Sequence, residues 1–430
     1  MPLTASILIS FVVSADPEIV AHEVSSFVGY AITDGEKAYS AGATWCNLGD
    51  ANAAWEFGTN QHPISALNLV RIENGALRHL GASWATHQFC ALQGAVCAEC
   101  IPAGAGCPPA LGVGCSTNST GTSLGLQSNM SRRSDANAAT GYFSFPFSNP
   151  PSTSLLDRRC RTAVADVDPA AHPNALFAFE LVTLHPSAGD PVARCVTRKV
   201  TTASMLGTPL ASGPSEEGST AIEWWASVVP GVTLVALDLP RDGRVIVGGN
   251  AFALPGGGWR YDYAIENVDS HEAIRALSIP RGNDVDFQSI EFHAPLAHSG
   301  EVTSNEPWNA IVSSDALTWS TPAFDVDPNA NAVRWGTTYT FSLISARPPV
   351  TGTVTLTHFR SNATEVVSLP VPEGLASGVI GDLDGDGAVS ATDLSILLGA
   401  WGPCRRCSAD FDGDGHVDAN DLAVLLGAWS

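Results

Sequence analysis

The chain has few basic residues and few charges of either sign. Lys and Arg number 21 against 43 Asp and Glu, and the formal net charge is −22. Charged residues make up 15% of the sequence, below the roughly 25% of an average soluble domain. Because phosphate binding requires clustered cations, this composition argues against nucleic acid as a partner. The acidic excess is typical either of a solubility charge or of carboxylates that bind a hard cation.

Long apolar runs are also absent. No window reaches the roughly 18 consecutive apolar residues of a membrane span, so we expect a soluble protein without one. Residues 3–13 form a short apolar run, and Val13-Ser14-Ala15 resembles a signal peptidase site, although no basic residue precedes Lys37. We therefore expect residues 1–15 to be a signal peptide, with a buried first strand or a misplaced start as the alternatives.

Hydrophobic residues, cysteine, glycine and proline are plentiful. A hydrophobic content of 45% in 430 residues allows a real core and roughly two or three domains. Ten Cys, 40 Gly and 28 Pro indicate a secreted protein, extracellular or at the cell surface, more than a cytosolic enzyme.

Residues 16–200 are expected to form a cysteine-bearing region of irregular and β structure. Most of its cysteines lie between residues 90 and 115, in a stretch rich in Gly, Pro, Ala and Ser that has little to bury. Cys97-x-x-Cys100 is compatible with half of a zinc site, but a second half is not evident and the export signals favour disulfides. The sequence does not choose among the cysteine pairings.

Residues 201–372 show the pattern of short, half-buried strands separated by turns. Apolar and aromatic side chains occupy every second position in 259–265 (WRYDYAI) and in 339–343 (YTFSL). This period of two, repeated at hairpin-like spacing, predicts a β-sandwich or a related antiparallel fold. We interpret residues 373–380 as a linker.

The strongest signal is an internal repeat, in which residues 382–393 recur as residues 410–421. Each copy has oxygen side chains at positions 1, 3, 5, 9 and 12 and glycine at position 6, the pattern of an EF-hand calcium loop. We expect two Ca²⁺ ions, one in each loop, with position 7 contributing its backbone carbonyl. The candidate ligands are Asp382, Asp384, Asp386, Ala388, Ser390 and Asp393 in the first loop, and Asp410, Asp412, Asp414, His416, Asp418 and Asp421 in the second.

A short amphipathic helix is expected after each loop. The apolar residues that share one face of these helices are Leu394, Leu397, Leu398 and Trp401, then Leu422, Leu425, Leu426 and Trp429. Each stripe is too short for a stable helix alone, so the two helices should pack together. Because the Asp residues of each loop repel one another, we predict that this module folds only when calcium is bound.

This tail, residues 381–430, resembles a type I dockerin, the duplicated loop-helix module that docks enzymes onto cohesin scaffolds. The resemblance rests on two calcium loops, each followed by a D-L-x-x-L-L-G-A-W helix. Thrombospondin-type calcium repeats share D-x-D-x-D-G but lack this helix. The resemblance implies a cohesin-like partner domain whose choice depends on loop positions 10 and 11. Those positions hold Ala391, Thr392, Ala419 and Asn420.

The join between the two copies, residues 402–407 (GPCRRC), departs from the cellulosomal pattern. It resembles a variant group called GC-type dockerins. This resemblance implies a disulfide between Cys404 and Cys407 that pins the join, and it weakens the expectation of an ordinary cohesin. The predicted fold class is therefore mainly β, with a disulfide-bearing, β-sandwich-like front region and a small all-α module at the C-terminus.

Candidate catalytic residues in the front region are few. A glycosidase needs two carboxylates that flank a sugar bond, and the best pair in the sequence is Glu180 and Glu223. Trp224 and Trp225, next to Glu223, have side chains suited to stacking on a sugar. The alternative, which we favour, is that both acids are ordinary strand-edge residues and the tryptophans are core. We therefore assign no catalytic residue.

Two further motifs carry less weight. Gly121-x-Ser123-x-Gly125 matches a nucleophile elbow as a string, but it follows a polar loop and not a strand. Residues 291–301 gather two histidines and two glutamates, which suits zinc or a transition metal, although hydrogen-bonded histidines are commoner.

Two functional hypotheses result. The first is a secreted modular protein, anchored or displayed by calcium-dependent binding to a cohesin-like domain, whose front region has a binding role. The second is a carbohydrate-active hydrolase of the glycoside hydrolase type, docked onto an assembly and acting on a polysaccharide. The sequence leaves open whether the protein is an enzyme.

Overall fold

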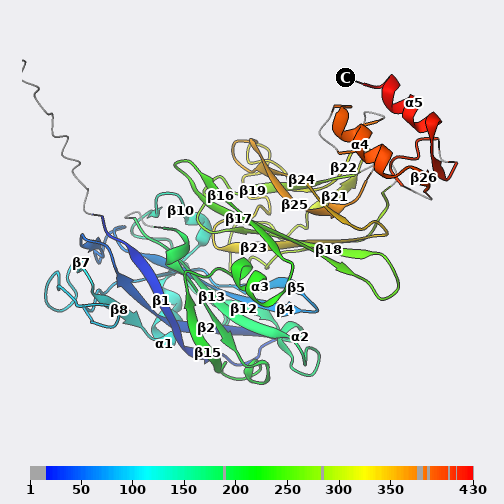
Figure 1. The fold of residues 1–430 in the computed structure, drawn as a ribbon. Helices are drawn as coiled ribbons and strands as arrows, with labels where there is room; N and C mark the ends of the chain where they lie inside the picture. Colours follow the sequence, from blue (N-terminus) through cyan, green and yellow to red (C-terminus); the bar gives the residue numbers. More distant parts are fainter. Residues whose placement is uncertain are drawn as a thin grey trace, which may run out of the picture.

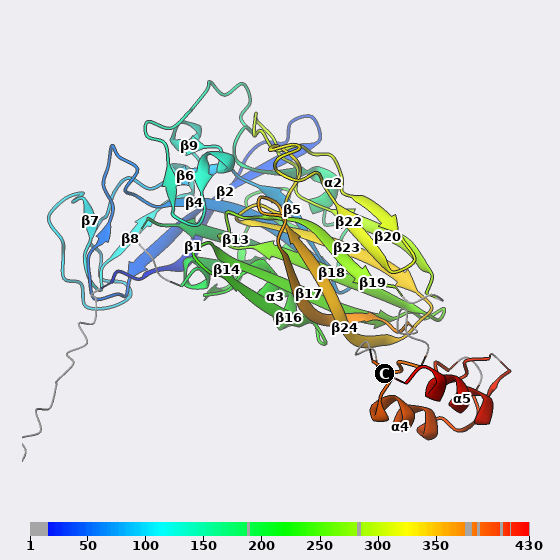
Figure 2. The ribbon, with the colours of Figure 1, turned by 90° about the horizontal axis from the view of Figure 1, so that it is seen from above.

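The computed structural model describes residues 16–186, 190–281, 285–374, 381–384, 388–404, 407–412 and 414–429. The segment expected to be a signal peptide, residues 1–15, lies outside them. No helix in these ranges is long and apolar enough to cross a membrane. Figures 1 and 2 show a large sheet from the N-terminal half of the chain, a sandwich from the following part, and a small helical module at the C-terminus.

The first part is an antiparallel sheet that curls until its ends approach each other. In spatial order its strands are β1 (Ile19–Gly29), β2 (Glu36–Asn47), β12 (Cys160–Ala163), β5 (Ala76–Ala82), β4 (Ile64–Glu73), β13 (Leu176–Leu184), β14 (Cys195–Val200) and β15 (Ala211–Glu217). Three short strands branch from it: β6 (Ala85–His87), β8 (Ser116–Ser119) and β9 (Met130–Ser131). The backbone of Val24 in β1 hydrogen-bonds to Ser215 of β15 at 3.1 Å and to Arg198 of β14 at 2.6 Å, which draws the ends together.

The central strands of this sheet are buried on both faces. In β13, Phe177, Phe179 and Leu181 belong to the core enclosed by the curled sheet, while Ala178 and Val182 belong to a second core on its outer face. A strand covered on both sides reads as a nearly continuous apolar run, which explains the sequence LFAFELVTL.

The second part is a sandwich of two five-stranded antiparallel sheets. The first sheet consists of β16 (Thr233–Leu239), β17 (Gly243–Ala253), β18 (Trp259–Asn267), β23 (Thr337–Ser345) and β20 (Phe287–His293). The second consists of β21 (Asn309–Val312), β22 (Ala316–Ser320), β19 (Ile274–Pro280), β24 (Pro349–His358) and β25 (Thr364–Pro372). The alternating side chains of β18 and β23, such as Tyr261, Tyr263 and Phe341, fill the core between the sheets. The predicted mainly β fold class is confirmed.

A single helix joins the curled sheet to the sandwich. α3 (Ala221–Val228) begins with a capping box, in which the Thr220 hydroxyl accepts from the Glu223 N–H and the Glu223 carboxylate accepts from the Thr220 N–H. Trp224 and Trp225 are 0% and 1% exposed, in the second core. That core also contains residues of β4, β13, β17 and β18, so the two parts share one apolar layer.

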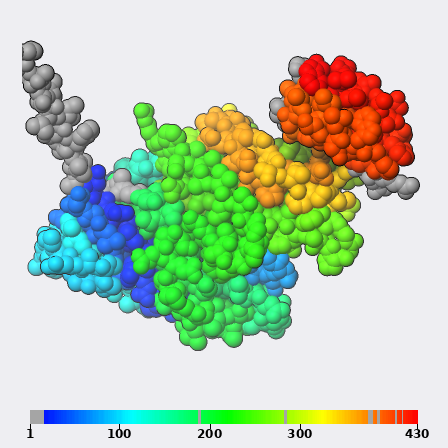
Figure 3. Space-filling model, in the orientation of Figure 1, coloured from blue at the N-terminus to red at the C-terminus, as the bar shows by residue number. Residues whose placement is uncertain are grey.

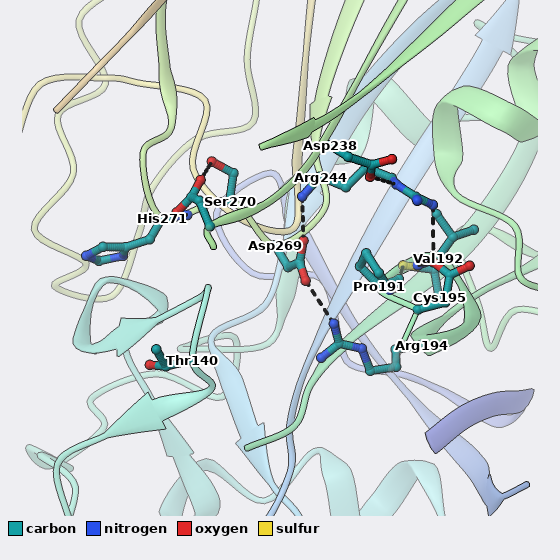
Figure 4. A network of polar contacts seen from close by, with 12 residues as sticks. Thr140, Pro191, Val192, Arg194, Cys195, Asp238, Arg244, Asp269, Ser270 and His271 are labelled. Atoms are coloured by element: carbon teal, nitrogen blue, oxygen red, sulfur yellow. Dashed lines mark hydrogen bonds and ion pairs between the residues drawn. The ribbon is translucent and has the colours of Figure 1, made fainter. Parts of the chain in front are cut away.

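Polar contacts cross the same boundary. The carboxylate of Asp269 accepts one hydrogen bond from the Arg194 guanidinium and one from the Arg244 N–H, both at 2.8 Å (Figure 4). Arg194 ends the short helix η3 (Val192–Arg194) before β14, whereas Asp269 follows β18. Both side chains are buried, and this pairing compensates the cost of burying either charge.

Disulfides hold the glycine-rich part of the first half. They join Cys46 to Cys97, Cys90 to Cys107 and Cys100 to Cys115, while Cys160 and Cys195 are buried free thiols. The disulfide interpretation of Cys97-x-x-Cys100 is therefore confirmed over the zinc alternative. The remaining short elements of the front region are β3 (Ala53–Ala54), β7 (Ala110–Leu111), α1 (Gly121–Leu124), η1 (Gln127–Asn129), η2 (Arg133–Asp135), β10 (Ala136–Asn137), β11 (Tyr142–Phe143), α2 (Val164–Val167) and η4 (Thr202–Ser204).

The C-terminal module contains two helices and a two-residue strand pair. These elements are α4 (Ala391–Gly399), β26 (Gly402–Pro403), β27 (His416–Val417) and α5 (Ala419–Gly427). Their small core consists of the buried residues Val389, Leu397, Ala409, Val417 and Leu425. Figure 3 shows the module as a separate lobe at one end of the molecule.

Candidate calcium and docking site

The two loop-helix copies have matching local structure. Each helix starts with a capping box: Ser390 caps α4 by accepting from the Thr392 N–H at 3.2 Å, and Asp418 caps α5 by accepting from the Asn420 N–H at 2.7 Å. Position 12 completes each box, since Asp393 accepts from the Ser390 N–H and Asp421 accepts from the Asp418 N–H.

The aspartates at position 12 also tie each helix to the start of its loop. Asp393 accepts from the N–H groups of Leu383 and Asp384 at 2.6 and 3.0 Å. In the second copy, Asp421 accepts from Phe411 and Asp412 at 2.6 and 3.4 Å. Both carboxylates are inaccessible to solvent.

These contacts determine the charge of the two buried aspartates. Burial alone would raise the pKa of Asp393, but the N–H donors of Ser390, Asp384 and Leu383 outweigh it and hold the pKa below its usual range. The pKa of Asp421 is lowered in the same way by its own N–H donors. Both groups are therefore carboxylates at neutral pH.

Three carboxylates gather in each loop. Ligand oxygens of Asp382, Asp384 and Asp393 lie within 4.8 Å of one another, and so do those of Asp410, Asp412 and Asp414. Oxygen ligands at this spacing suit a hard cation such as Ca²⁺, which takes six to eight of them. The residues present therefore fit calcium.

The other candidate ligands make different contacts or lie outside the described residues. Ser390 and Asp418 act as helix caps, Asp421 binds backbone N–H groups, and Asp386 lies outside the described residues. In the second loop, the N–H of His416 donates to Asp414, and its side chain is exposed. The roles of Ala388 and His416 as backbone ligands stay predictions.

The four residues at loop positions 10 and 11 form the first turns of the two helices. Ala391 and Thr392 begin α4, Ala419 and Asn420 begin α5, and all four are exposed. They are accessible to a partner.

The apolar stripe of each helix is only partly buried, which corrects the expectation that it packs wholly between the helices. Leu397 and Leu425 are buried, and Leu394 and Leu422 are half-buried. The exposed apolar residues, in the same order in both copies, are Ile396, Leu398 and Trp401, then Val424, Leu426 and Trp429. The sequence pattern assigned four of these residues to the core. Each short helix carries more apolar residues than it can bury, and this excess indicates that some of them are exposed.

Cys404 and Cys407 are joined by a disulfide. Both half-buried cysteines pack against the module core, and the N–H of Cys404 donates to Gly415 of the second loop at 2.9 Å. The join between the copies is thereby fixed to the second calcium loop.

The candidate sugar-binding residues of the front region are structural. Glu180 is fully buried and accepts from Asn68 at 2.6 Å and from the N–H of Ala221 at 2.7 Å. Glu223 caps α3, and the neighbouring Trp224 and Trp225 are buried in the second core, where they cannot stack on a sugar. The interpretation of the two tryptophans as core residues is correct. The strand-edge interpretation of the two acids is wrong, because Glu180 lies in β13, between two other strands, and Glu223 lies in a helix.

The weaker motifs are also accounted for. Ser123 lies in the short helix α1 and forms part of its cap, with its N–H donating to Thr120. His293 and His298 hydrogen-bond to the backbone carbonyls of His79 and Ala82, at 2.9 and 2.8 Å. Residues 291–301 do not form a metal cluster within the described part of the chain.

Two hollows lie between the curled sheet and the sandwich. A polar cleft of about 390 Å³ separates the β4–β5 hairpin from the outer face of β18, β23 and β20. An arginine pocket of about 80 Å³ is lined by Arg133, Arg334 and Arg360 together with aromatic and aliphatic side chains. Sequence reasoning missed both, because their residues come from distant segments.

Charges in the polar cleft are paired. Arg260 forms an ion pair with Asp262 at 2.8 Å, Arg78 with Glu291 at 3.5 Å, and Arg71 with Glu73 at 3.6 Å. Burial raises the pKa of Asp262, and the neighbouring Glu291 adds to this, although Arg260 opposes it.

Comparison with known proteins identifies the tail. No curated protein matches the chain. One matching solved structure is titled "Complete structure of manganese lipoxygenase of Gaeumannomyces graminis and partial structure of zonadhesin of Komagataella pastoris". It is 10% identical over 82% of this chain and 94% of that chain, and its TM-score of 0.20 is too low to carry an argument. Residues 380–427 match the family model described as the dockerin type I domain, so the chain carries a C-terminal type I dockerin domain.

Proposed function

We propose that the chain is an extracellular modular protein whose dockerin binds two Ca²⁺ ions and thereby holds the front region on a cohesin-like domain. The observation that carries the proposal is the occurrence of a cluster of three carboxylates in each of the two loops of a dockerin type I domain. Dockerin domains bind cohesin-type partners in a calcium-dependent manner, and the three disulfides of the front region suit an oxidising location.

The exposed apolar residues supply a surface for such a partner. Trp401 and Trp429 are 48% and 45% exposed, and Leu398 and Leu426 are each 52% exposed. Exposed apolar clusters on a folded module are characteristic of protein interaction sites. We assign this surface, together with loop positions 10 and 11, to the cohesin-like domain.

Calcium titration of the full chain tests the proposal. We expect two ions to bind per chain by isothermal titration calorimetry, and a panel of cohesin domains to be bound in calcium but not in EDTA. Asp382→Ala and Asp410→Ala should each remove one ion, whereas Asp286→Ala in the front region, whose side chain is 90% exposed, should remove none. Unchanged stoichiometry in both loop variants would refute the ligand assignment.

A polysaccharide hydrolase is the second candidate, and one arrangement in the polar cleft favours it. Asp262 of β18 pairs with Ser342 of β23, which pairs with Glu291 of β20, so the three residues form one row on adjacent strands. Strands lie about 4.8 Å apart, so two acids separated by one strand have backbones about 9.6 Å apart. Inverting glycosidases hold their carboxyl groups at about 6.5–9.5 Å. The substrate class rests only on analogy with other dockerin-bearing proteins.

Activity of the full chain on a polysaccharide panel decides between the candidates. Under the hydrolase hypothesis, Glu291→Gln and Asp262→Asn abolish cleavage, while Glu306→Gln, an exposed acid away from the cleft, leaves it unchanged. Absence of cleavage by the unsubstituted protein would leave the front region as a displayed, non-hydrolytic module.

A further inference from the structure

The arginine pocket concentrates positive charge in an acidic protein. Three of the 21 basic residues of the chain line this small space, and Glu301 is the one acidic side chain in its described lining. The Glu301 carboxylate accepts from the N–H groups of Arg133 and Val302, at 2.9 and 3.0 Å. It is therefore committed to the backbone and does not neutralise a guanidinium by direct contact.

The three arginines are held by neutral groups. Arg133, which is buried, donates to the carbonyls of Ser83, Gly336 and Leu67 and to the side chain of Asn68. In the described part of the chain, none of the three guanidiniums lies within ion-pair distance of a carboxylate.

Aromatic rings and carbonyl groups position the other two guanidiniums. Arg334 lies 4.9 Å from the centroid of Phe359 and donates to Pro328 and Ala330, and Arg360 lies 4.3 Å from the centroid of Phe324. Phe324 and Phe359 contact each other edge to face, at 5.5 Å. Stacking fixes a guanidinium plane and leaves its edge available for a carboxylate or phosphate.

Two donors of residues that line this pocket have no hydrogen-bond partner among the described residues. The Nε of Arg334 and the hydroxyl of Ser134 are both buried without a hydrogen bond in the described residues. An unpaired buried donor costs about 1–3 kcal/mol, so it indicates a group that completes the site. An acceptor oxygen that reached either donor would satisfy it.

Apolar side chains supply about half of the remaining lining residues. Trp84, Trp335 and Leu296 are among the residues that surround the cavity. His271, on its wall, follows Asp269, which is anchored between Arg194 and Arg244 (Figure 4). An apolar pocket with a few convergent polar groups is the usual form of a small-molecule site. Apolar walls also favour an organic acid over inorganic phosphate, which has no apolar part.

We propose that the arginine pocket binds a small organic carboxylate, with the anionic group against Arg334 and Arg360 and the apolar part against Trp84 and Trp335. The inference concerns the front region and does not depend on calcium or on docking. Butyrate is a suitable probe, because it combines a carboxylate with an apolar chain short enough for this cavity.

Calorimetric titration of the full chain with butyrate tests the proposal. We expect one butyrate per chain, and no binding of butyramide, which has the same shape without the charge, or of inorganic phosphate. Arg334→Gln and Arg360→Gln should each weaken binding at least tenfold. Arg275→Gln is the matched control, since this arginine of the sandwich lies outside the pocket and hydrogen-bonds to Asn362.

Three results would overturn the proposal: no binding of butyrate at millimolar concentration, equal binding of butyramide, or unchanged affinity in both arginine variants. Thermal unfolding of each variant verifies its fold. Because Arg360 is only half-buried, its substitution keeps the test available if Arg334→Gln does not fold.

Discussion

The front region and the dockerin are stabilised by different means. The front region buries large side chains such as Trp45, Trp224 and Phe179 in extensive apolar cores and adds three disulfides. The dockerin core has five fully buried apolar residues, none of them aromatic. Since apolar burial contributes roughly 25 cal/mol per Å², the module gains far less from its core.

The two regions also bury different ionisable groups. Burial lowers the pKa of His62, His79, His87 and His298 in the front region and holds these four side chains neutral at pH 7. The dockerin instead buries the carboxylates of Asp393 and Asp421 in their charged form. The front region is thus stable through its own packing. The dockerin gathers negative charge that a bound cation would balance, and we predict that its fold depends on this cation.

Calcium removal should produce the largest difference between the regions. In EDTA we expect the amides of α4 and α5 to lose their protection from hydrogen exchange completely, because repulsion within each acid cluster exceeds what the small core supplies. Amides of β13, between two apolar cores, should keep their protection. Retained protection in α4 and α5 at full chelation would contradict the calcium dependence of the fold.

Acidification should have the opposite effect to calcium removal, because it should destabilise the front region before it destabilises the dockerin. Burial lowers the pKa of His62 and His298 to about 4, and of His79 and His87 to about 3. Unfolded histidines bind protons near pH 6.5, so the stability that is present above that pH is lost progressively as pH falls from about 6.5 to the folded pKa values of about 4 and about 3.

The two buried aspartates of the dockerin lose their stabilising effect at a lower pH than the front-region histidines. Their folded pKa lies below the unfolded value of about 3.9, so their contribution is present above that value and lost only beneath it. Calorimetry in saturating calcium between pH 7 and 4.5 should show the front-region transition moving to lower temperature while the dockerin transition stays in place. His416→Gln, at an exposed position, is a control that should change neither. Earlier loss of the dockerin transition would contradict this order.

Substitutions of two neighbouring leucines of α5 should have separate effects, one on the stability of the dockerin and the other on its binding to a partner. Leu425 is fully buried, so Leu425→Ala should destabilise the calcium-loaded dockerin by about 2–5 kcal/mol in urea unfolding. Leu426 is 52% exposed, so Leu426→Ala should change stability by about 0.5 kcal/mol or less while weakening binding to the cohesin-like domain. Equal destabilisation by both substitutions would place Leu426 in the core.

The parts of the molecule that sequence predicts well are those specified locally. The dockerin loops and helices follow from residue spacing within one short segment, and the β18 and β23 strands follow from alternation that one strand displays by itself. The curled sheet does not, because β12 inserts between β2 and β5 from a distant part of the chain. Its cysteine pairing is equally non-local.

The sites of the front region depend on the same long-range pairing. Arg133, Arg334 and Arg360 come together only after the curled sheet and the sandwich have packed, and no spacing in the sequence signals their meeting. Trp224 and Trp225 differ from the arginines, because their local sequence did indicate a site. The sequence was compatible with stacking on a sugar, but the fold buries both side chains between two sheets, where they are core residues.

Helix caps should give the smallest and most specific difference between the regions. Thr220 caps α3 in the front region, and Ser390 caps α4 in the dockerin through the same capping box. Removing either hydroxyl with alanine should lower the free energy of unfolding by about 0.5–2 kcal/mol.

Ser390 also stands at position 9 of the calcium loop. The loss of stability in Ser390→Ala should therefore grow as the calcium concentration is lowered, whereas the loss in Thr220→Ala should not. Thr220→Ser and Ser390→Thr, which keep the hydroxyl, should restore stability in urea unfolding at two calcium concentrations. A calcium-independent loss at both positions would mean that Ser390 acts as a cap alone and that the first loop binds its ion without this hydroxyl.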